Sequence, residues 1–391
     1  MTEYLKTKSE KTCYGCRACE QVCPHGAILM MPDDEGFLYP LLDGERCTDC
    51  GLCEKVCPYE DESRANAPIC VFAAQSSNIN SLMESSSGGA FSVLSDYILE
   101  QGGYVCGCIF DGSFTAIHTV TNEKSVTEKM RGSKYVQSDV KNTFSEIKKL
   151  LDENKKVLFT GTPCQVDGLK CYLLKDYENL YTADLICHGV PSPRLLSDYL
   201  ETVRKKHGEV TELIFRDKKR HGWSERGTIK YNEKSKTIEF SNNSYYNLYL
   251  QDAVSRKCCY ECKYARTDRV GDITLGDFWG AENVIPNIKA EKGVSAVLVN
   301  TDKGKSLFNA VKDKITLTDA TLKSVADNNG NLTTPSKMPK KREKIYHRIE
   351  KDGYLSVAKA ECHYQYIKPI LRKIIPKSLK KTIKNLLRGR K

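Results

Sequence analysis

Eight cysteines of this chain fall into two runs with the same spacing. The first run consists of Cys13, Cys16, Cys19 and Cys23, followed by Pro24, and the second of Cys47, Cys50, Cys53 and Cys57, followed by Pro58. Both runs read C-x2-C-x2-C-x3-C-P. Three thiols this close together can surround one corner of a metal cluster, and the fourth ligand must come from a part of the chain that returns. The repeat therefore predicts a small unit, residues 1–62, built around two clusters.

The spacing is that of bacterial two-cluster ferredoxins, in which three cysteines of one run and the fourth of the other bind each 4Fe–4S cluster. We assign cluster I to Cys13, Cys16, Cys19 and Cys57, and cluster II to Cys47, Cys50, Cys53 and Cys23. A structural zinc site is the alternative, but zinc is satisfied by two spaced ligand pairs and does not need a triplet plus one. The pattern predicts that single electrons move through this unit.

Length and cysteine usage set the outer limits. The 391 residues predict two or three domains. Residues 1–11 are polar and contain no apolar signal-peptide core. Because the thiolates among the 18 cysteines must stay reduced, we expect a cytoplasmic protein. No apolar stretch reaches the length of a membrane-spanning helix.

The net charge of +10 comes from the C-terminal end. Residues 368–391 carry ten basic side chains and no acidic one, and apolar residues recur there every three or four positions, as on one face of a helix. We predict that this basic amphipathic tail, residues 367–391, contacts the inner face of a membrane as a peripheral anchor. Docking on a partner protein and a solvated tail are the alternatives. Nucleic acid is not expected, since no aromatic residues are interleaved with the basic ones.

Between residues 68 and 320, short apolar runs alternate with helical stretches. We expect strands at 69–74, 104–110, 156–160, 181–186, 212–215 and 294–300, and helices at 88–99, 143–154, 193–206 and 303–313. Strands separated by helices predict an α/β (α+β) catalytic domain with a central sheet. A linker at 60–68 precedes this domain, and an extension at 321–366 is expected to wrap or link.

Four further cysteines occupy positions where ligands gather in an α/β fold. Cys164 and Cys187 each follow a predicted strand, at the sheet edge where such folds bind ligands. Cys259 and Cys262 form a C-x2-C pair. The four together would make a third 4Fe–4S site, and the alternative for Cys164 and Cys187 is that they are small buried hydrophobes. The other thiols are expected in the core: Cys70, Cys106, Cys108, Cys171 and Cys362.

The segment Gly271–Gly280 combines three glycines, two acids and two aromatics. Glycines are unfavourable in a strand unless something approaches the backbone closely, and a flat ligand such as a flavin is a candidate. A turn in which Asp277 caps a helix is the alternative. No G-x-G-x-x-G occurs, so a nucleotide would be held in another way. Ser87-Gly88-Gly89 could present helix N–H groups to a pyrophosphate, and Arg131 and Lys134 could supply cations. The alternative for the serines is a capped loop.

Eight motifs together carry a resemblance. They are Ser87–Ala90, Arg131–Val136, Gly161–Gln165, Cys187–Pro193, Phe215–Lys218, Gly222–Trp223, the Cys259/Cys262 pair and Gly271–Gly280, in this order. Over residues 10–300 the chain resembles the beta subunit family of coenzyme F-420 hydrogenase and dehydrogenase, preceded by a ferredoxin doublet. The resemblance implies a domain with FAD and its own 4Fe–4S cluster that acts on a deazaflavin.

The resemblance further implies an oxidoreductase that moves electrons between reduced coenzyme F-420 and ferredoxin-type partners through FAD and the clusters. Arg131 and Lys134 would contact the FAD. The flavin edge would be shaped by Asp272, Gly276, Asp277, Phe278 and Trp279. The anionic deazaflavin tail would meet Lys134, Lys218, Lys219 and Arg220, for which a solvated loop is the alternative.

Two rival functions remain. One is a ferredoxin-dependent flavin and iron–sulfur reductase of an unidentified substrate, for which a cell-surface polysaccharide precursor would suit a membrane-associated tail. The other is an electron-transfer adaptor that contains clusters but no flavin.

Overall fold

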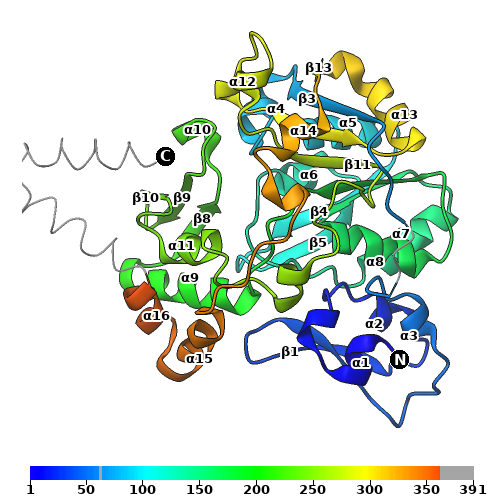
Figure 1. Cartoon of the computed structure of the whole chain (residues 1–391), viewed down its shortest axis with the longest axis vertical. Coiled ribbons are helices and arrows are strands. Elements are labelled where there is room, and N and C mark those ends of the chain that lie inside the picture. Colours follow the sequence, from blue (N-terminus) through cyan, green and yellow to red (C-terminus); the bar gives the residue numbers. More distant parts are fainter. Residues whose placement is uncertain (61–63, 362–391) are drawn as a thin grey trace, which may run out of the picture.

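The computed structural model describes residues 1–60 and 64–361. The predicted basic tail at 367–391, the end of the 321–366 extension and Cys362 lie outside the described residues. Figure 1 shows a small N-terminal unit below a large central sheet, with a second lobe beside the sheet. Within the described part of the chain, no helix has the length and apolar character to cross a membrane.

The N-terminal unit contains the two cysteine runs and little regular structure. Its elements are α1 (Glu3–Thr7), η1 (Glu10–Thr12), α2 (Ala18–Val22), the antiparallel strands β1 (Ile28–Pro32) and β2 (Leu38–Leu42), and α3 (Leu52–Lys55). The third cysteine of each run lies in a short helix, Cys19 in α2 and Cys53 in α3, and the two helices contact each other. Each run thereby brings its fourth cysteine toward the other run.

The large domain is built on an eight-stranded mixed sheet with the order β13-β3-β12-β11-β7-β6-β4-β5. The strands are β3 (Cys70–Ser76), β4 (Tyr104–Phe110), β5 (Ala116–Thr121), β6 (Val157–Gly161), β7 (Leu180–Leu185), β11 (Ile273–Asp277), β12 (Ser295–Val299) and β13 (Ile315–Asp319). The four neighbours β4, β6, β7 and β11 are parallel, so their carboxyl ends meet at one edge. The predicted α/β architecture with a central sheet is confirmed.

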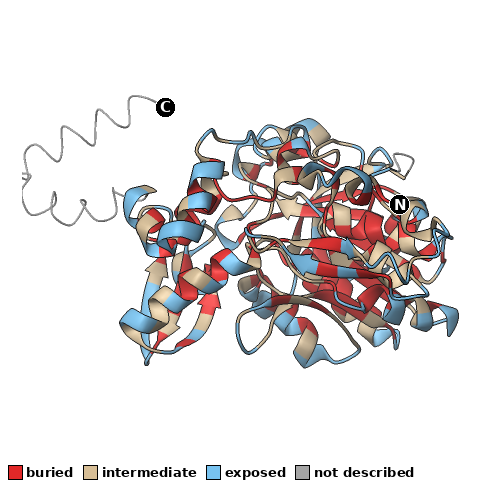
Figure 2. Ribbon diagram, turned by 90° about the horizontal axis from the view of Figure 1, so that it is seen from below, coloured by how far each residue is buried: buried red, intermediate tan, exposed pale blue. Residues whose placement is uncertain are grey.

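Helices cover both faces of this sheet, as the buried residues in Figure 2 show. The helices of the domain are α4 (Ile79–Glu84), α5 (Ala90–Glu100), α6 (Lys124–Met130), α7 (Thr143–Asp152), α8 (Pro163–Leu173), α12 (Ala281–Val284), α13 (Asp302–Val311) and α14 (Leu322–Ala326). Along β6, Leu158 belongs to the core under α5 and α13, whereas Val157 and Phe159 belong to the core under α7 and α8. This alternation is the period of two that a strand buried on both faces requires.

The second lobe contains a separate antiparallel sheet of order β10-β9-β8. Its elements are α9 (Pro193–His207), β8 (Val210–Ile214), α10 (Lys218–His221), β9 (Gly227–Tyr231), β10 (Lys234–Ile238), α11 (Ser244–Leu250), α15 (Arg342–Asp352) and α16 (Tyr354–Glu361). The strand predicted at 212–215 is therefore present as β8, but it pairs here and not in the central sheet. The extension wraps onto this lobe, where Ile345, Tyr346 and Val357 are buried.

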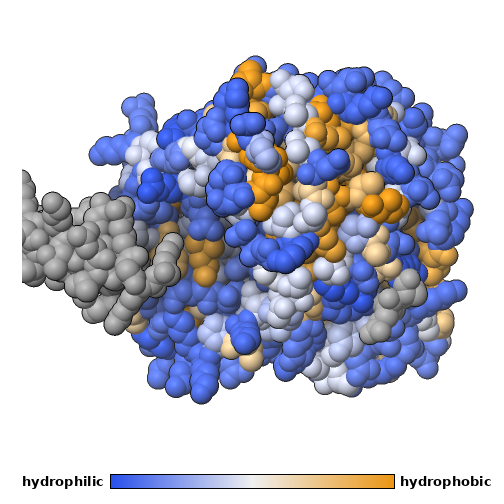
Figure 3. All heavy atoms as spheres, turned by 45° about the horizontal axis from the view of Figure 1, so that its top comes forward, coloured by the Kyte–Doolittle hydropathy of each residue, from blue (hydrophilic) through white to orange (hydrophobic). Residues whose placement is uncertain are grey.

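The surface is predominantly hydrophilic. On the face in Figure 3, hydrophobic residues gather in one area among hydrophilic ones. On the hairpin of the N-terminal unit, Leu29, Met31 and Leu41 are about half exposed (55%, 48% and 55%).

Candidate iron–sulfur and cofactor site

A cavity of about 830 Å³ lies at the carboxyl ends of β6, β7 and β11. Ligand pockets usually measure about 300–1,000 Å³. Its wall also includes the start of α5, at Gly89 and Ala90. The position agrees with the general rule that open α/β sheets bind ligands beyond the carboxyl ends of parallel strands.

All four cysteines of the predicted third site line this cavity, and we name Cys164, Cys187, Cys259 and Cys262 the cavity cysteines. Cys164 is in the first turn of α8, Cys187 follows β7, and Cys259 lies in the short helix η2 (Lys257–Glu261). Burial raises the pKa of the Cys164 thiol, and the nearby thiolates of the other three raise it further. The backbone N–H of Gly189 donates to Cys187 Sγ at 3.4 Å. Four mutually close thiols, one of which accepts an N–H bond, fit the ligand set of a 4Fe–4S cluster.

The ligands predicted for cluster I are also brought together. Burial raises the pKa of the Cys16 thiol, and the thiolates of Cys19, Cys57 and Cys13 raise it further. Cys57 belongs to the second run, so the structure places the fourth ligand as the crossed assignment requires. The N–H of Gly15 donates to Cys13 Sγ at 3.4 Å.

The ligands predicted for cluster II lie nearer the surface. Cys50 is exposed, and Cys23, Cys47 and Cys53 are partly exposed. Cys23 Sγ accepts from the N–H of Ala27 at 3.3 Å, and Cys47 Sγ from the N–H of Asp49 at 3.4 Å. Burial raises the pKa of Cys19 in the other set, and among the thiolates that raise it further is Cys53, so the two sets are adjacent.

Neither the cavity cysteines nor the two runs form a mononuclear site. Among residues 1–60 and 64–361, no three His, Cys, Asp or Glu side chains converge as the ligands of a single metal ion would. A 4Fe–4S cluster binds each thiolate through a different iron, so its ligands surround a volume and do not meet at a point.

Helix α8 joins the cavity to the first run. Cys164 is in the first turn of α8, and Gly168 follows one turn later. A Cβ atom placed on Gly168 would lie 2.9 Å from Cys16 Cβ and 3.0 Å from Cys16 Sγ. Tyr14, also in the first run, lines the cavity and packs edge-on against Tyr264 with 5.3 Å between ring centroids. The cavity and the cluster I ligands therefore share a wall.

Ion pairs fix the N-terminal unit on the large domain. Arg17 Nε contacts Asp139 Oδ1 at 2.5 Å, and Lys11 Nζ contacts Glu261 Oε1 at 2.5 Å. Lys257, two residues before Cys259, pairs with Glu10. The unit is thus held in one position relative to the cavity.

Most of the residues predicted for a flavin line the cavity. They are Ser87, Gly89, Arg131, Lys134, Gly276, Asp277 and Trp279. Three predicted residues do not line it, and these predictions are corrected by the structure.

Phe278 is fully buried in the core with Val294 and Ile285. It faces away from the cavity because neighbours in an extended chain point to opposite sides. Asp272 lies at the other end of β11, where it accepts from the Thr182 N–H at 2.8 Å and from its hydroxyl at 2.7 Å. Gly88 packs against the sheet, since a Cβ there would lie 1.9 Å from the carbonyl oxygen of Ala74.

The two predicted phosphate cations already have protein partners. Lys134 Nζ donates to the carbonyls of Met130, Arg131 and Gly132 at 3.2, 3.0 and 3.1 Å. An ammonium has three donors, so Lys134 can offer a ligand its charge but no free N–H. Burial lowers the pKa of Lys134. Arg131 pairs with Glu84 at 2.7 Å.

The three cations predicted for an anionic tail are outside the cavity wall and are paired. Lys218 Nζ donates to the carbonyl of Ser87 at 2.5 Å, and burial lowers its pKa to about 8. Lys219 pairs with Glu84 at 2.8 Å, and Arg220 with Asp217 at 2.6 Å. The structure therefore assigns them contacts within the protein.

A polar and aromatic group at the cavity was not predicted as a unit. Arg216 donates to both carboxylate oxygens of Asp277, at 2.7 and 3.2 Å, and lies over the Trp279 ring at 4.9 Å. Trp223 donates to Asp277 at 3.0 Å and stacks on Trp279 with 4.7 Å between centroids. The motifs Phe215–Lys218 and Gly222–Trp223 were the only signal, and it did not show that they meet Asp277.

Two histidines of the cavity wall were also missed. His188 Nε2 faces Asp252 at 2.9 Å, and Nδ1 faces Asn331 at 3.1 Å. Burial would lower the pKa of His188, but the bond and charge of Asp252 outweigh it and raise the pKa. His118 bonds the carbonyl of Thr160 at 3.0 Å, and burial lowers its pKa to about 4. Neither position stands out from its sequence neighbours.

Comparisons with known proteins agree with this site. Residues 154–324 match the family model that describes the C-terminal region of the coenzyme F420 hydrogenase/dehydrogenase beta subunit, and residues 12–60 match the 4Fe-4S dicluster domain. A similar solved structure is the xenon-derivatised F420-reducing NiFe hydrogenase complex from Methanosarcina barkeri, at 16% identity and a TM-score of 0.46, covering 81% of this chain and 97% of that chain. No curated protein matches.

Proposed function

Because residues 154–324 belong to the coenzyme F420 hydrogenase/dehydrogenase beta subunit family and residues 12–60 to the 4Fe-4S dicluster domains, the chain is an iron–sulfur protein of the oxidoreductase class. We propose that it moves electrons between reduced coenzyme F420 and ferredoxin-type partners through FAD and three 4Fe–4S clusters. The observation that carries this proposal is that the cavity, the cavity cysteines and the first run share a wall.

The cavity has the size and the polar ends that a dinucleotide cofactor needs. The first-turn N–H groups of α5 begin after Gly89, which makes no side-chain cap bond. Such uncapped N–H groups are suited to a pyrophosphate. Trp279, fixed between Arg216 and Trp223, would hold the isoalloxazine ring. When bound, FAD supplies the exchange between two-electron and one-electron chemistry.

The protein residues contribute position and exclusion of water. Asp277 receives three hydrogen bonds, two from Arg216 and one from Trp223, so its carboxylate holds both side chains in place. His188, locked between Asp252 and Asn331, keeps a polar edge beside Cys187. Tyr14 and Tyr264 close the wall toward cluster I.

The order of the ligand sets supports a direction along the molecule. The cavity cysteines contact the first run through Gly168 and Tyr14, cluster I adjoins cluster II, and cluster II lies nearest the solvent at Cys50. We infer that the exposed second set exchanges electrons with the external partner.

Two rivals are separated by cofactor content and donor. Anaerobically purified protein should contain FAD near one per chain and about twelve irons, four per cluster. Clusters without flavin would support the adaptor. About eight irons would overturn the third cluster and leave the dicluster unit.

The donor is tested by bleaching of the bound flavin and clusters. Reduced F420, NADH, NADPH and reduced ferredoxin are each added to the anaerobic holoprotein in stopped flow. We expect reduced F420 to bleach the protein fastest. Bleaching by reduced ferredoxin alone would instead favour the reductase of an unidentified substrate.

A further inference from the structure

Arg256 is a fully buried cation at the junction of two ligand sets. It lies three residues before Cys259, and its carbonyl accepts from the N–H of Cys259 at 2.9 Å. Its guanidinium extends to the first run, where Nε donates to the carbonyl of Cys13 at 2.9 Å. One side chain thus spans from the cavity cysteines to the ligands of cluster I.

The other partners of Arg256 are neutral. Its terminal nitrogens donate to Leu38 O at 2.9 Å and to Gln137 Oε1 at 3.1 Å. The Gln137 amide in turn donates to the carbonyl of Tyr14 at 2.9 Å. The guanidinium also lies over the Tyr39 ring at 4.0 Å. In the described ranges, no carboxylate forms an ion pair with Arg256.

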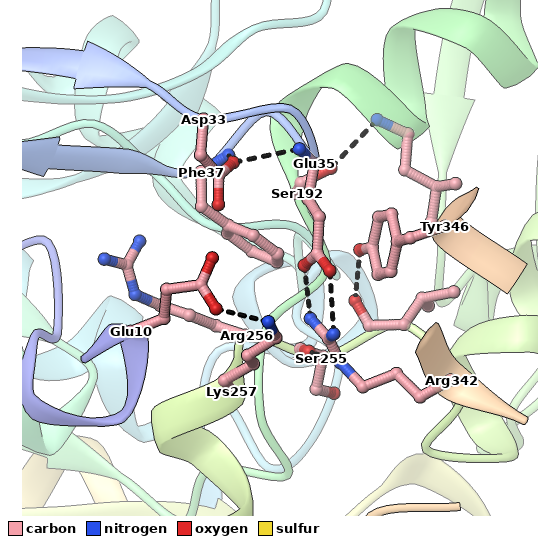
Figure 4. A network of polar contacts seen from close by, with 12 residues as sticks. Glu10, Asp33, Glu35, Phe37, Ser192, Ser255, Arg256, Lys257, Arg342 and Tyr346 are labelled. Carbon is pink, nitrogen blue, oxygen red and sulfur yellow. Dashed lines mark hydrogen bonds and ion pairs between the residues drawn. The ribbon is translucent and has the colours of Figure 1, made fainter. Parts of the chain in front are cut away.

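Arg342 shows how this fold otherwise treats a buried arginine. It is equally buried, yet it donates to both oxygens of Glu35, at 2.8 and 2.5 Å (Figure 4). It also donates to the carbonyl of Ser255, the residue before Arg256. A buried charge without a counter-charge is strongly unfavourable. Arg256 therefore needs anions that the side-chain carboxylates do not supply.

The nearest anions are the cluster ligands. Burial would lower the pKa of Arg256, but Tyr39 and the thiolates of Cys13, Cys258 and Cys259 outweigh it and raise the pKa. A bound cluster carries net negative charge, which increases by one unit on reduction.

The first run makes room for this guanidinium. A Cβ on Gly15 would lie 3.0 Å from the Arg256 terminal nitrogen and 3.2 Å from its Cζ. The equivalent position of the second run is Asp49, and both have left-handed backbone, with φ of 71° for Gly15 and 52° for Asp49. The second run shows that this backbone accepts a side chain, so the glycine at position 15 is explained by the close approach of Arg256.

We infer that Arg256 is a positioning residue that raises the reduction potential of cluster I and holds the first run against the Cys259 segment. A fixed cation stabilises the cluster more after it has gained an electron than before. The effect on cluster I requires only the dicluster unit, whereas the link to Cys259 rests on the proposed third cluster.

The test is an EPR-monitored redox titration of the anaerobic holoprotein with Arg256→Gln and Arg256→Lys. Arg256→Gln should leave the iron content unchanged and lower the reduced-to-oxidised ratio of one dicluster cluster at least tenfold at fixed potential. For one electron this corresponds to about 59 mV. Arg256→Lys keeps the charge and should recover most of this shift. The potential of the other dicluster cluster should stay unchanged.

A second pair keeps the test decisive if Arg256→Gln does not retain iron. Gly15→Asp would place a carboxylate beside Arg256 and offset its charge, while Gly15→Asn has the same size without the charge. Gly15→Asp should show the lower potential of the two. Equal potentials in this pair, or equal shifts for Gln and Lys at position 256, would overturn the inference. Because these readouts concern the dicluster unit, they hold whether the total is eight or twelve irons.

Discussion

The two cysteine runs have one spacing and one backbone but different surroundings. In the first run, Tyr14 and Cys16 are buried, whereas Cys50 in the second run is exposed. The backbone is left-handed two residues after the first cysteine in both runs, and there the first has Gly15 and the second Asp49. The same motif thus serves as an inner cluster site against the large domain and as an outer site facing solvent.

The difference arises from what packs against each run. Gly168 of α8 and Arg256 press on the first run, and Arg17 pairs with Asp139 of the large domain. The equivalent of Arg17 in the second run is Gly51, where an added Cβ would meet nothing within 4 Å. Burial by a second domain, and not the ligand motif, decides which cluster is internal.

The largest expected effect breaks the inner end of the path. Cys259→Ala should remove about four irons and abolish electron flow from the cavity to the two runs, because a cluster with three thiolates is not retained. The N-terminal dicluster signals should remain. Iron analysis and EPR measure both results, and Cys258→Ala, a buried neighbour outside the predicted set, should keep all irons. An unchanged iron content in Cys259→Ala would show that the third set is misassigned.

The next effect tests the contact between α8 and the first run. Alanine normally stabilises a helix by about 1 kcal/mol relative to glycine. At Gly168 the new methyl would press on Cys16, and overpacking costs about 1–3 kcal/mol. We therefore expect Gly168→Ala to lower the thermal unfolding temperature of the anaerobic protein.

The matched control lies beside the second run. Gly44 has no atom within 4 Å of an added Cβ. Gly44→Ala should leave the unfolding temperature unchanged or slightly higher. A stabilised Gly168→Ala protein would contradict the tight contact.

A smaller effect concerns the rates at which the clusters decay. Chelator in the presence of oxygen should release iron in phases, the fastest amounting to about four irons, because Cys50 is exposed and Cys16 is not. Cys50→Ser should remove or accelerate only this phase, as followed by absorbance of the clusters. Loss of all irons at one rate would remove the distinction between an inner and an outer cluster.

The smallest expected effect tests the ion pair that anchors the first run. Asp139→Asn should lower the free energy of unfolding by about 1 kcal/mol, since the pair is only partly exposed and partly screened. Asp43→Asn, in the exposed pair with Arg46 beside the second run, is the control and should have no measurable effect. Denaturant unfolding of both proteins gives the comparison, and equal losses would contradict it.

Several elements of the fold could be predicted from the sequence because they depend on local patterns. The strand at 104–110 and the helix at 193–206 were found within a residue, since apolar periodicity and a proline at the helix start are local signals. The strand at 212–215 was found but assigned to the wrong sheet, because pairing depends on partners distant in sequence.

The flavin residues show the same limit. Asp277 and Trp279 were correctly expected at one place, yet Phe278 between them faces the core. Strand alternation would have separated them. Arg216 could not be assigned, because its partner Asp277 is 61 residues away.

By itself the sequence determined that two 4Fe–4S clusters are bound, because ligand spacing is a local property of the chain. It also indicated the four cavity cysteines. Only the tertiary structure decided which run is internal, why Gly15 stands where Asp49 stands in the repeat, and how Arg256 joins the two ligand sets. The physical reason is that burial and charge depend on segments that meet only in the folded molecule.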